Sequence, residues 1–144
     1  MNYLAAFEIS ATGMSVERLR ADIATTNLAN MHTTRTAKGG AYTPLRATVT
    51  NARGVDFETH LNASELADAR PQVTIESTEV PPRMVYEPGH PDANDKGFVA
   101  YPNINLVSEM VNLMTATRSY QANVSAFNSA KSMALKALEI GGRS

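Results

Sequence analysis

The sequence predicts an α+β protein in which a helix at each end flanks a small β-rich middle. All seven prolines lie between Pro44 and Pro102. The flanks, each of roughly 40 residues, contain no proline and carry apolar residues at helical spacing. Because proline removes a backbone donor and clashes with the preceding turn, its confinement to one stretch marks where long helices are excluded. The two terminal helices must either meet each other or find partners in neighbouring molecules.

The C-terminal flank shows the strongest periodicity in the chain. Its apolar positions alternate by four and three residues, which is a heptad seam: Leu106, Met110, Leu113, Thr117, Tyr120, Val124, Phe127, Lys131, Ala134 and Leu138. Asn105 is suited to cap the start of this helix, and Gly141 is suited to end it. At 1.5 Å per residue a helix from Leu106 to Ile140 runs about 50 Å, which is too long for a compact domain of this size.

The N-terminal flank predicts a second helix whose apolar stripe shifts. Leu4, Phe7, Ala11 and Met14 form one stripe, whereas Val16, Leu19 and Ile23 continue on another face. Gly13 lies near the change, so either the helix begins after it or something packs closely there. We expect one helix that ends near Asn30. Asn27 and Asn30 could cap its last carbonyls or bond a neighbouring backbone, and the sequence leaves both open.

The middle predicts short strands and turns. Alternating apolar residues indicate strands at four places: Leu45 to Val49, Val55 to Phe57, Val73 to Ile75, and Met84 to Tyr86. Pro81-Pro82 and Pro88-Gly89 are typical of turns, and the second favours type II with positive φ at the glycine. Ser64 to Ala69 is either a short helix or a loop insertion. We expect a helical domain formed by residues 1–31 and 104–141, and a central β-rich segment at 32–103.

Composition excludes several classes of partner. The 144 residues carry a net charge of -1 without a basic run, which leaves no electrostatic footprint for nucleic acid or an anionic membrane. No stretch approaches the roughly 18 apolar residues of a spanning helix, so we expect no direct membrane insertion. The first 13 residues lack a basic region and contain Glu8, so no Sec-type signal peptide is predicted. With no cysteine, thiol chemistry is absent.

One local cluster invites a metal or catalytic interpretation: His90, Asp92, Asn94 and Asp95. Against the calcium-loop pattern, Lys96 and Asn103 occupy positions that should carry charged ligands, so the match fails. The alternative is an ordered turn in which Asp and Asn side chains cap backbone amides. No nucleophile elbow or nucleotide loop occurs. We therefore expect no catalytic, cofactor or metal site.

The heptad seam needs more cover than the first helix offers. Seven large apolar residues on it would contribute roughly 10 to 20 kcal/mol if they were buried, and the shorter first helix can cover only part of them. Self-association or a helical partner is therefore predicted. The expected assembly interface consists of Leu106, Met110, Leu113, Tyr120, Val124, Phe127 and Leu138.

Three runs of residues carry a family resemblance. The second half contains Tyr86-Glu-Pro-Gly-His-Pro-Asp-Ala-Asn-Asp-Lys-Gly-Phe-Val99, Tyr101-Pro-Asn-Ile-Asn105 and Arg118-Ser-Tyr-Gln-Ala-Asn-Val124. These runs resemble the C-type proximal rod proteins of the bacterial flagellar basal body. Asn27-Leu-Ala-Asn30 with Thr33 is similar to the N-terminal motif of flagellar rod and hook axial proteins. Residues 43–80 match least, and Ala41-Tyr-Thr-Pro44 departs from the family pattern.

The resemblance implies a structural subunit. In such proteins the terminal helices pair as an antiparallel coiled coil and pack with neighbours into a helical tube that encloses the export channel and transmits torque. The implied partners are copies of the chain, other rod proteins and the rod base adaptor at the motor ring; distal rod and bushing-ring proteins are open as further partners. The implied location is the periplasm-spanning rod, reached by flagellar type III export without a cleavable signal peptide.

Two alternatives stay open at this point. The first is another rod or hook-type axial protein. The second is a rod-associated, peptidoglycan-cleaving enzyme, which would need an acid/base pair in a cleft. Glu76, Glu79 and Glu87 are carboxylates in a suitable region, but nothing in the sequence orients them.

Overall fold

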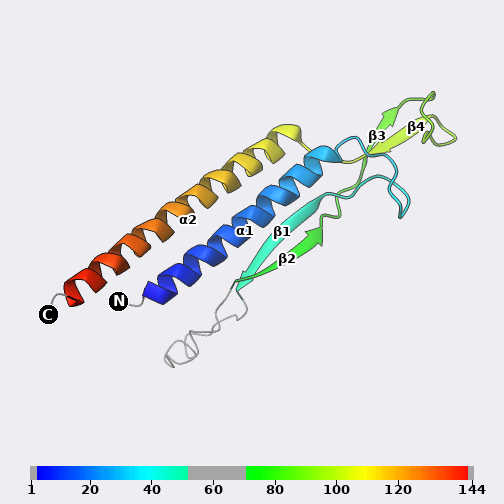
Figure 1. Cartoon of the computed structure of the whole chain (residues 1–144). Coiled ribbons are helices and arrows are strands. Elements are labelled where there is room, and N and C mark those ends of the chain that lie inside the picture. The colour runs from blue at the N-terminus through cyan, green and yellow to red at the C-terminus, as the bar shows by residue number, and fades with distance from the viewer. Residues whose placement is uncertain (1–2, 52–70, 143–144) are drawn as a thin grey trace. The chain divides into compact units, whose positions relative to one another are not determined.

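The computed structural model describes residues 3–51 and 71–142 (Figure 1). Its elements follow the order α1 (Tyr3–Ala29), β1 (Leu45–Asn51), β2 (Pro71–Ser77), β3 (Arg83–Tyr86), β4 (Phe98–Tyr101) and α2 (Leu106–Gly141). The described residues form two compact units. One contains α1 up to Leu19, the last residues of β1 from Val49, the first residues of β2 up to Val73, and α2 from Thr115 onward. The other contains Arg20–Thr48 and Thr74–Met114.

α1 is a single helix over Tyr3–Ala29, which confirms the prediction of one helix ending near Asn30. Its C-terminus is closed by Asn30, whose backbone N donates to Thr26 O at 3.1 Å. Gly13 lies inside this helix because α2 approaches closely there. A Cβ on Gly13 would lie 2.8 Å from Asn123 Nδ2. Of the two explanations that the sequence left open for Gly13, close packing is therefore correct.

α2 is a helix of 36 residues over Leu106–Gly141. Asn105 caps it as predicted, since its Oδ1 accepts a hydrogen bond from Ser108 N at 3.1 Å. At the other end Gly142 N donates to Leu138 O at 2.9 Å. In the described part of the chain, neither helix is long and apolar enough to cross a membrane.

The two helices pair antiparallel, as expected. In the first unit the rings of Phe7 and Phe127 lie 4.9 Å apart, and Gly13 lies against Asn123. In the second unit Asn27 bonds Glu109. The partner residue number falls as the α1 number rises, which is the signature of antiparallel pairing.

The face of α2 that meets α1 is shifted from the predicted seam by one row. Buried Ala116 and Ala130 lie seven residues on either side of Asn123, so all three share one stripe of the helix. Phe127 belongs to the predicted seam and also borders this stripe. The inward face therefore pairs one predicted row with a row of small residues, whereas Met110 of the other predicted row is exposed.

The strands form two sheets of two strands each. β1 (Leu45–Asn51) pairs with β2 (Pro71–Ser77), and the contacts Thr78 N to Pro44 O and Thr48 Oγ1 to Glu76 Oε2 fit an antiparallel arrangement. β3 (Arg83–Tyr86) pairs antiparallel with β4 (Phe98–Tyr101), with Val85 opposite the fully buried Val99. The strands predicted at Leu45, Val73 and Met84 are confirmed. β4 was not predicted.

The connection between β3 and β4 corrects one expectation. Glu87–His90 is a turn, closed by His90 N donating to Glu87 O at 3.1 Å. Gly89 does not have positive φ, so the predicted type II turn is wrong. The positive φ of this loop belongs to Gly97, at 78°, where a Cβ would lie 2.9 Å from Tyr86 Cε2. The close approach of the Tyr86 ring and the backbone conformation both require glycine there.

Two expectations lie outside the described residues: the strand at Val55 to Phe57 and the element at Ser64 to Ala69. The division into a terminal helical domain and a central segment at 32–103 stays a prediction.

Candidate functional site

Asn27 is a buried polar side chain of the second unit with four hydrogen bonds. Its side chain is buried, with 2% of the residue exposed. Its Nδ2 donates to Leu45 O at 2.9 Å and to Glu109 Oε2 at 3.2 Å, while its Oδ1 accepts from Leu45 N at 2.9 Å and from the Tyr42 hydroxyl at 2.9 Å. The amide thus pairs with both backbone groups of Leu45, as a neighbouring strand would.

The two asparagines of the motif have different roles. Asn30 donates from Nδ2 to Thr26 O at 2.9 Å and accepts from Thr33 Oγ1 at 3.1 Å, so it caps the end of α1. Asn27 instead bonds a neighbouring backbone. Of the two interpretations that the sequence left open, capping of the helix end holds for Asn30, and bonding to a neighbouring backbone holds for Asn27.

The partners of Asn27 were not predicted, because they reach it through a turn. The chain reverses at Gly39 and Gly40, which have φ of 85° and 75°. Tyr42 N then donates to Thr33 O at 3.0 Å, which brings Tyr42 and Leu45 back to the helix. The Gly-Gly pair is the sequence signal that could have indicated this reversal.

Burial raises the pKa of the Tyr42 hydroxyl, and the nearby Glu109 carboxylate raises it further. Both effects favour the neutral phenol. This is the form that donates to Asn27, so the bond network and the electrostatics agree.

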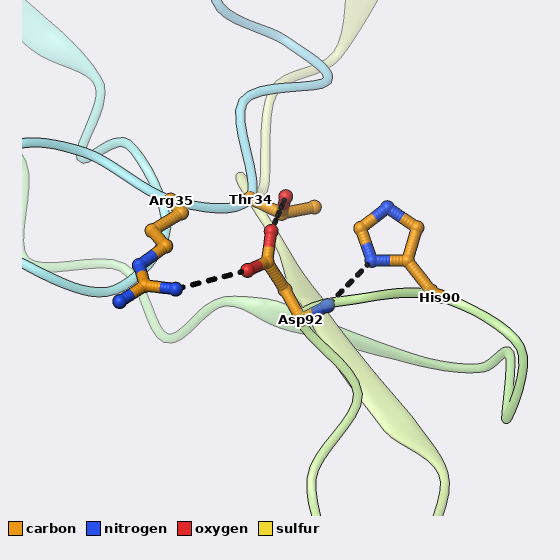
Figure 2. A network of polar contacts seen from close by, with 4 residues as sticks. All are labelled: Thr34, Arg35, His90 and Asp92. Carbon is orange, nitrogen blue, oxygen red and sulfur yellow. Dashed lines mark hydrogen bonds and ion pairs between the residues drawn. The ribbon is translucent and has the colours of Figure 1, made fainter.

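A second polar junction joins the loop after α1 to the loop between β3 and β4 (Figure 2). Asp92 Oδ2 accepts from Thr34 Oγ1 at 2.7 Å, and Asp92 Oδ1 lies 3.7 Å from Arg35 Nη1. We call these three residues the Asp92 clasp. The Arg35 side chain is 77% exposed and that of Asp92 22%, so solvent reaches the ion pair.

The loop itself contains side-chain caps, as predicted for an ordered turn. Asn94 Oδ1 accepts from Lys96 N at 3.0 Å and Phe98 N at 2.9 Å. His90 Nδ1 accepts from Asp92 N at 3.1 Å. The prediction for Asn94 is confirmed. Asp92 was expected to cap its own loop and instead bonds across to Thr34 and Arg35.

Tyr101 lies beside two of the histidines. Its ring centroid is 6.3 Å from that of His90 and 6.4 Å from that of His32. The hydroxyl donates to Glu87 Oε2 at 2.9 Å. This hydrogen bond is the main cause of the raised pKa of Tyr101.

The predicted assembly residues fall into two groups. Leu113, Val124 and Phe127 are half-buried, whereas Leu106, Met110, Tyr120 and Leu138 are exposed. Near the start of α2 the exposed residues merge with apolar neighbours into one surface. We call this surface the outward face: Leu106, Val107, Met110, Val111 and Met114.

The described residues contain no group of three His, Asp or Glu side chains placed to hold a metal ion. The three carboxylates considered for catalysis do not converge either. The Glu76 carboxylate accepts a hydrogen bond from Thr48, and the Glu87 carboxylate accepts one from Tyr101. Glu79 lies in the segment between β2 and β3 and is exposed. No acid/base pair of a hydrolase emerges from these contacts.

Comparison with known proteins gives concordant matches. Residues 95–140 match the family model described as flagellar basal body rod FlgEFG protein C-terminal. The flagellar basal-body rod protein FlgC of Bacillus subtilis is 37% identical over 141 residues, covering 92% of this chain and 94% of that protein. FlgC of Escherichia coli O157:H7 is 36% identical over 98% of this chain and 99% of its own length. FlgC of Borreliella burgdorferi is 35% identical over 97% and 98%.

An antiparallel pair of terminal helices with an apolar outward face, together with these relatives, defines a structural subunit of the flagellar axis. The relatives cover nearly the whole chain at more than 30% identity. The chain belongs to the flagellar basal-body rod protein family, and within it to the FlgC type.

Proposed function

We propose that the chain is a structural subunit of the proximal rod of the flagellar basal body, and that neighbouring subunits pack on the outward face of α2. The observation that carries the proposal is the exposure of this face. Met110 is 51% exposed and Val107 68%, with no described segment covering them. An apolar helix face that its own chain leaves open is typical of an interaction surface.

Its partners are copies of the chain, other rod proteins and the rod base adaptor at the motor ring, with distal rod and bushing-ring proteins as further candidates. The family membership and the paired helices support this assignment. Residues 1–31 and 104–141 supply the packing helices, and 32–103 form a central segment between them. Residues Leu113, Tyr120, Val124, Phe127 and Leu138 extend the interface along α2.

The mode of action is mechanical. Packed helix faces transmit torque and enclose the export channel, and the chain catalyses no reaction. Its location is the periplasm-spanning rod, reached by export without a cleavable signal peptide.

The test is a carboxylate on the outward face. Because Met110 is half exposed in the single chain, Met110→Asp should leave the subunit folded. In an assembled rod the substitution would lose the burial of the half of Met110 that is still exposed, roughly 0.75 to 1.5 kcal/mol, and would place a carboxylate in the contact. We expect at least a tenfold loss of rods and hooks recovered from cells, together with loss of motility.

Thr115→Asp is the matched control. Thr115 is exposed on the same helix, about 140° around it from Met110 at 3.6 residues per turn. Both variants must first be shown to be produced and exported. Normal assembly by Met110→Asp would exclude the outward face as the contact, and equal failure of both variants would show that the effect is not specific to that face.

A further inference from the structure

One bond in the second unit depends on the protonation of a histidine. His90 Nδ1 accepts from Asp92 N at 3.1 Å (Figure 2). A ring nitrogen accepts a hydrogen bond only when it carries no proton, so the neutral imidazole with its proton on Nε2 is the form that fits. This bond holds the backbone of Asp92 in place. The carboxylate of Asp92 in turn bonds the loop after α1.

That carboxylate links segments that are far apart in sequence. Thr34 and Asp92 are separated by 58 residues, and their bond of 2.7 Å is the shorter of the two contacts in the clasp. Arg35 adds a solvent-exposed ion pair at 3.7 Å. A change in the Asp92 backbone therefore reaches the loop after α1 through Thr34 and Arg35.

The titratable groups around His90 come from several segments. The ring centroid of Tyr101 is 6.3 Å from that of His90 and 6.4 Å from that of His32. The Tyr101 hydroxyl donates to Glu87. Of these residue types, histidine is the one that ordinarily changes charge between pH 5 and 8.

We propose that His90 is a proton-operated switch that keeps the Asp92 clasp closed at neutral pH and opens it in mild acid. Protonation of Nδ1 places a donor opposite the Asp92 N–H, which breaks the cap. The loss of this bond releases the Asp92 backbone, and with it the carboxylate that accepts from Thr34.

The experiment measures hydrogen exchange at the Asp92 amide by NMR on the full chain. Protection is expressed relative to the intrinsic exchange rate at each pH. If exchange proceeds from the form with a protonated His90, we expect protection of the Asp92 amide to fall about tenfold between pH 7.5 and 5.5. The midpoint must coincide with the titration of the His90 ring signals. Constant protection, or a different midpoint, overturns the proposal.

His90→Asn separates the switch from the cap. An asparagine side-chain oxygen accepts from the backbone N–H two residues on, so the cap survives without a titrating group. We expect this variant to keep Asp92 protected at both pH values. His32→Asn is the matched control and should retain the wild-type loss. A pH step that persists in His90→Asn, or vanishes in His32→Asn, contradicts the assignment to His90. The wild-type midpoint decides the matter if a variant does not fold.

Discussion

The Asn27 and Asp92 junctions both join segments of the second unit, but by opposite means. Asn27 is a neutral amide, almost completely buried, with four hydrogen bonds. Asp92 is a charged group in partial contact with solvent, and Arg35, its partner, is largely exposed. The neutral amide of Asn27 is therefore buried and fully hydrogen-bonded. The ion pair of Asp92 and Arg35 is in contact with water, which screens the two charges.

The comparison indicates that the neutral junction contributes more to stability. Leaving a buried donor or acceptor without its partner costs about 1 to 3 kcal/mol. An exposed ion pair contributes about 0 to 1 kcal/mol.

Asn27→Asp should be the most damaging of these substitutions. It replaces the donor that faces Leu45 O and Glu109 with an acceptor, and it places two carboxylates side by side in a buried site. We expect the free energy of unfolding to fall by on the order of 3 to 5 kcal/mol at pH 7. Chemical denaturation followed by circular dichroism measures this loss.

The pH dependence supplies a second check on the same variant. Burial and Glu109 raise the folded-state pKa of the introduced carboxyl, so the folded state binds a proton more readily than the unfolded state. The lost stability should then be partly recovered as the pH falls through that folded-state pKa. Asn30→Asp, at the half-buried C-terminal end of α1, is the control and should cost less than about 1 kcal/mol. Equal losses for the two variants would remove the distinction between the two asparagines.

Asp92→Asn should have a much smaller effect. The amide oxygen retains an acceptor for the Thr34 hydroxyl, and only the charge facing Arg35 is lost. We expect a change of less than about 0.5 kcal/mol in the same denaturation experiment. A loss above about 1.5 kcal/mol would show that the exposed ion pair matters as much as the buried amide.

The smallest effect concerns the titration of Tyr42. Glu109→Gln removes a carboxylate that raises the pKa of Tyr42, so the phenol should ionise at lower pH, as followed by its NMR signals in alkaline titration. Because the folded-state pKa is raised, the stability from the neutral phenol is present below pH 10 and is lost as the pH rises through the folded-state value. Glu87→Gln should leave Tyr42 unchanged and lower the pKa of Tyr101. A Tyr42 titration unaffected by Glu109→Gln would leave burial as the sole cause.

The sequence predicted the elements better than their contacts. Absence of proline and helical spacing located both helices, and Asn105 marked the start of α2 correctly. β4 was missed because Phe98–Tyr101 is a short apolar run without alternation. Its pairing with β3 is a tertiary contact that periodicity cannot reveal.

The orientation of α2 shows why periodicity alone did not identify the buried row. The predicted seam follows the four-three alternation, whereas α1 presents Gly13 to α2. A close approach of two helices favours small residues, so Ala116 and Ala130 occupy the buried stripe and Met110 lies outside it. The alanines are visible in the sequence of α2, but the partner helix determines which row of side chains is buried.

The sequence predicted the candidate site only in part, because the contacts of its residues also depend on tertiary packing. Asn27 and Asn30 were singled out, but their roles differ through burial, which depends on where Tyr42 and Leu45 return to the helix. Thr34 and Arg35 carried no signal as partners of Asp92. Their contact depends on the spatial meeting of two loops.

The Asn27 amide also has a consequence for the order in which the chain closes. It completes a ring of 18 residues with Leu45 and one of 82 residues with Glu109. Taken alone, the larger ring costs about 1.3 kcal/mol more loop entropy than the smaller one. We therefore expect the turn at Gly39 and Gly40 to bring Leu45 to the amide first. The same side chain is then in position to bond Glu109, so the local closure prepares the distant one that joins α1 to α2.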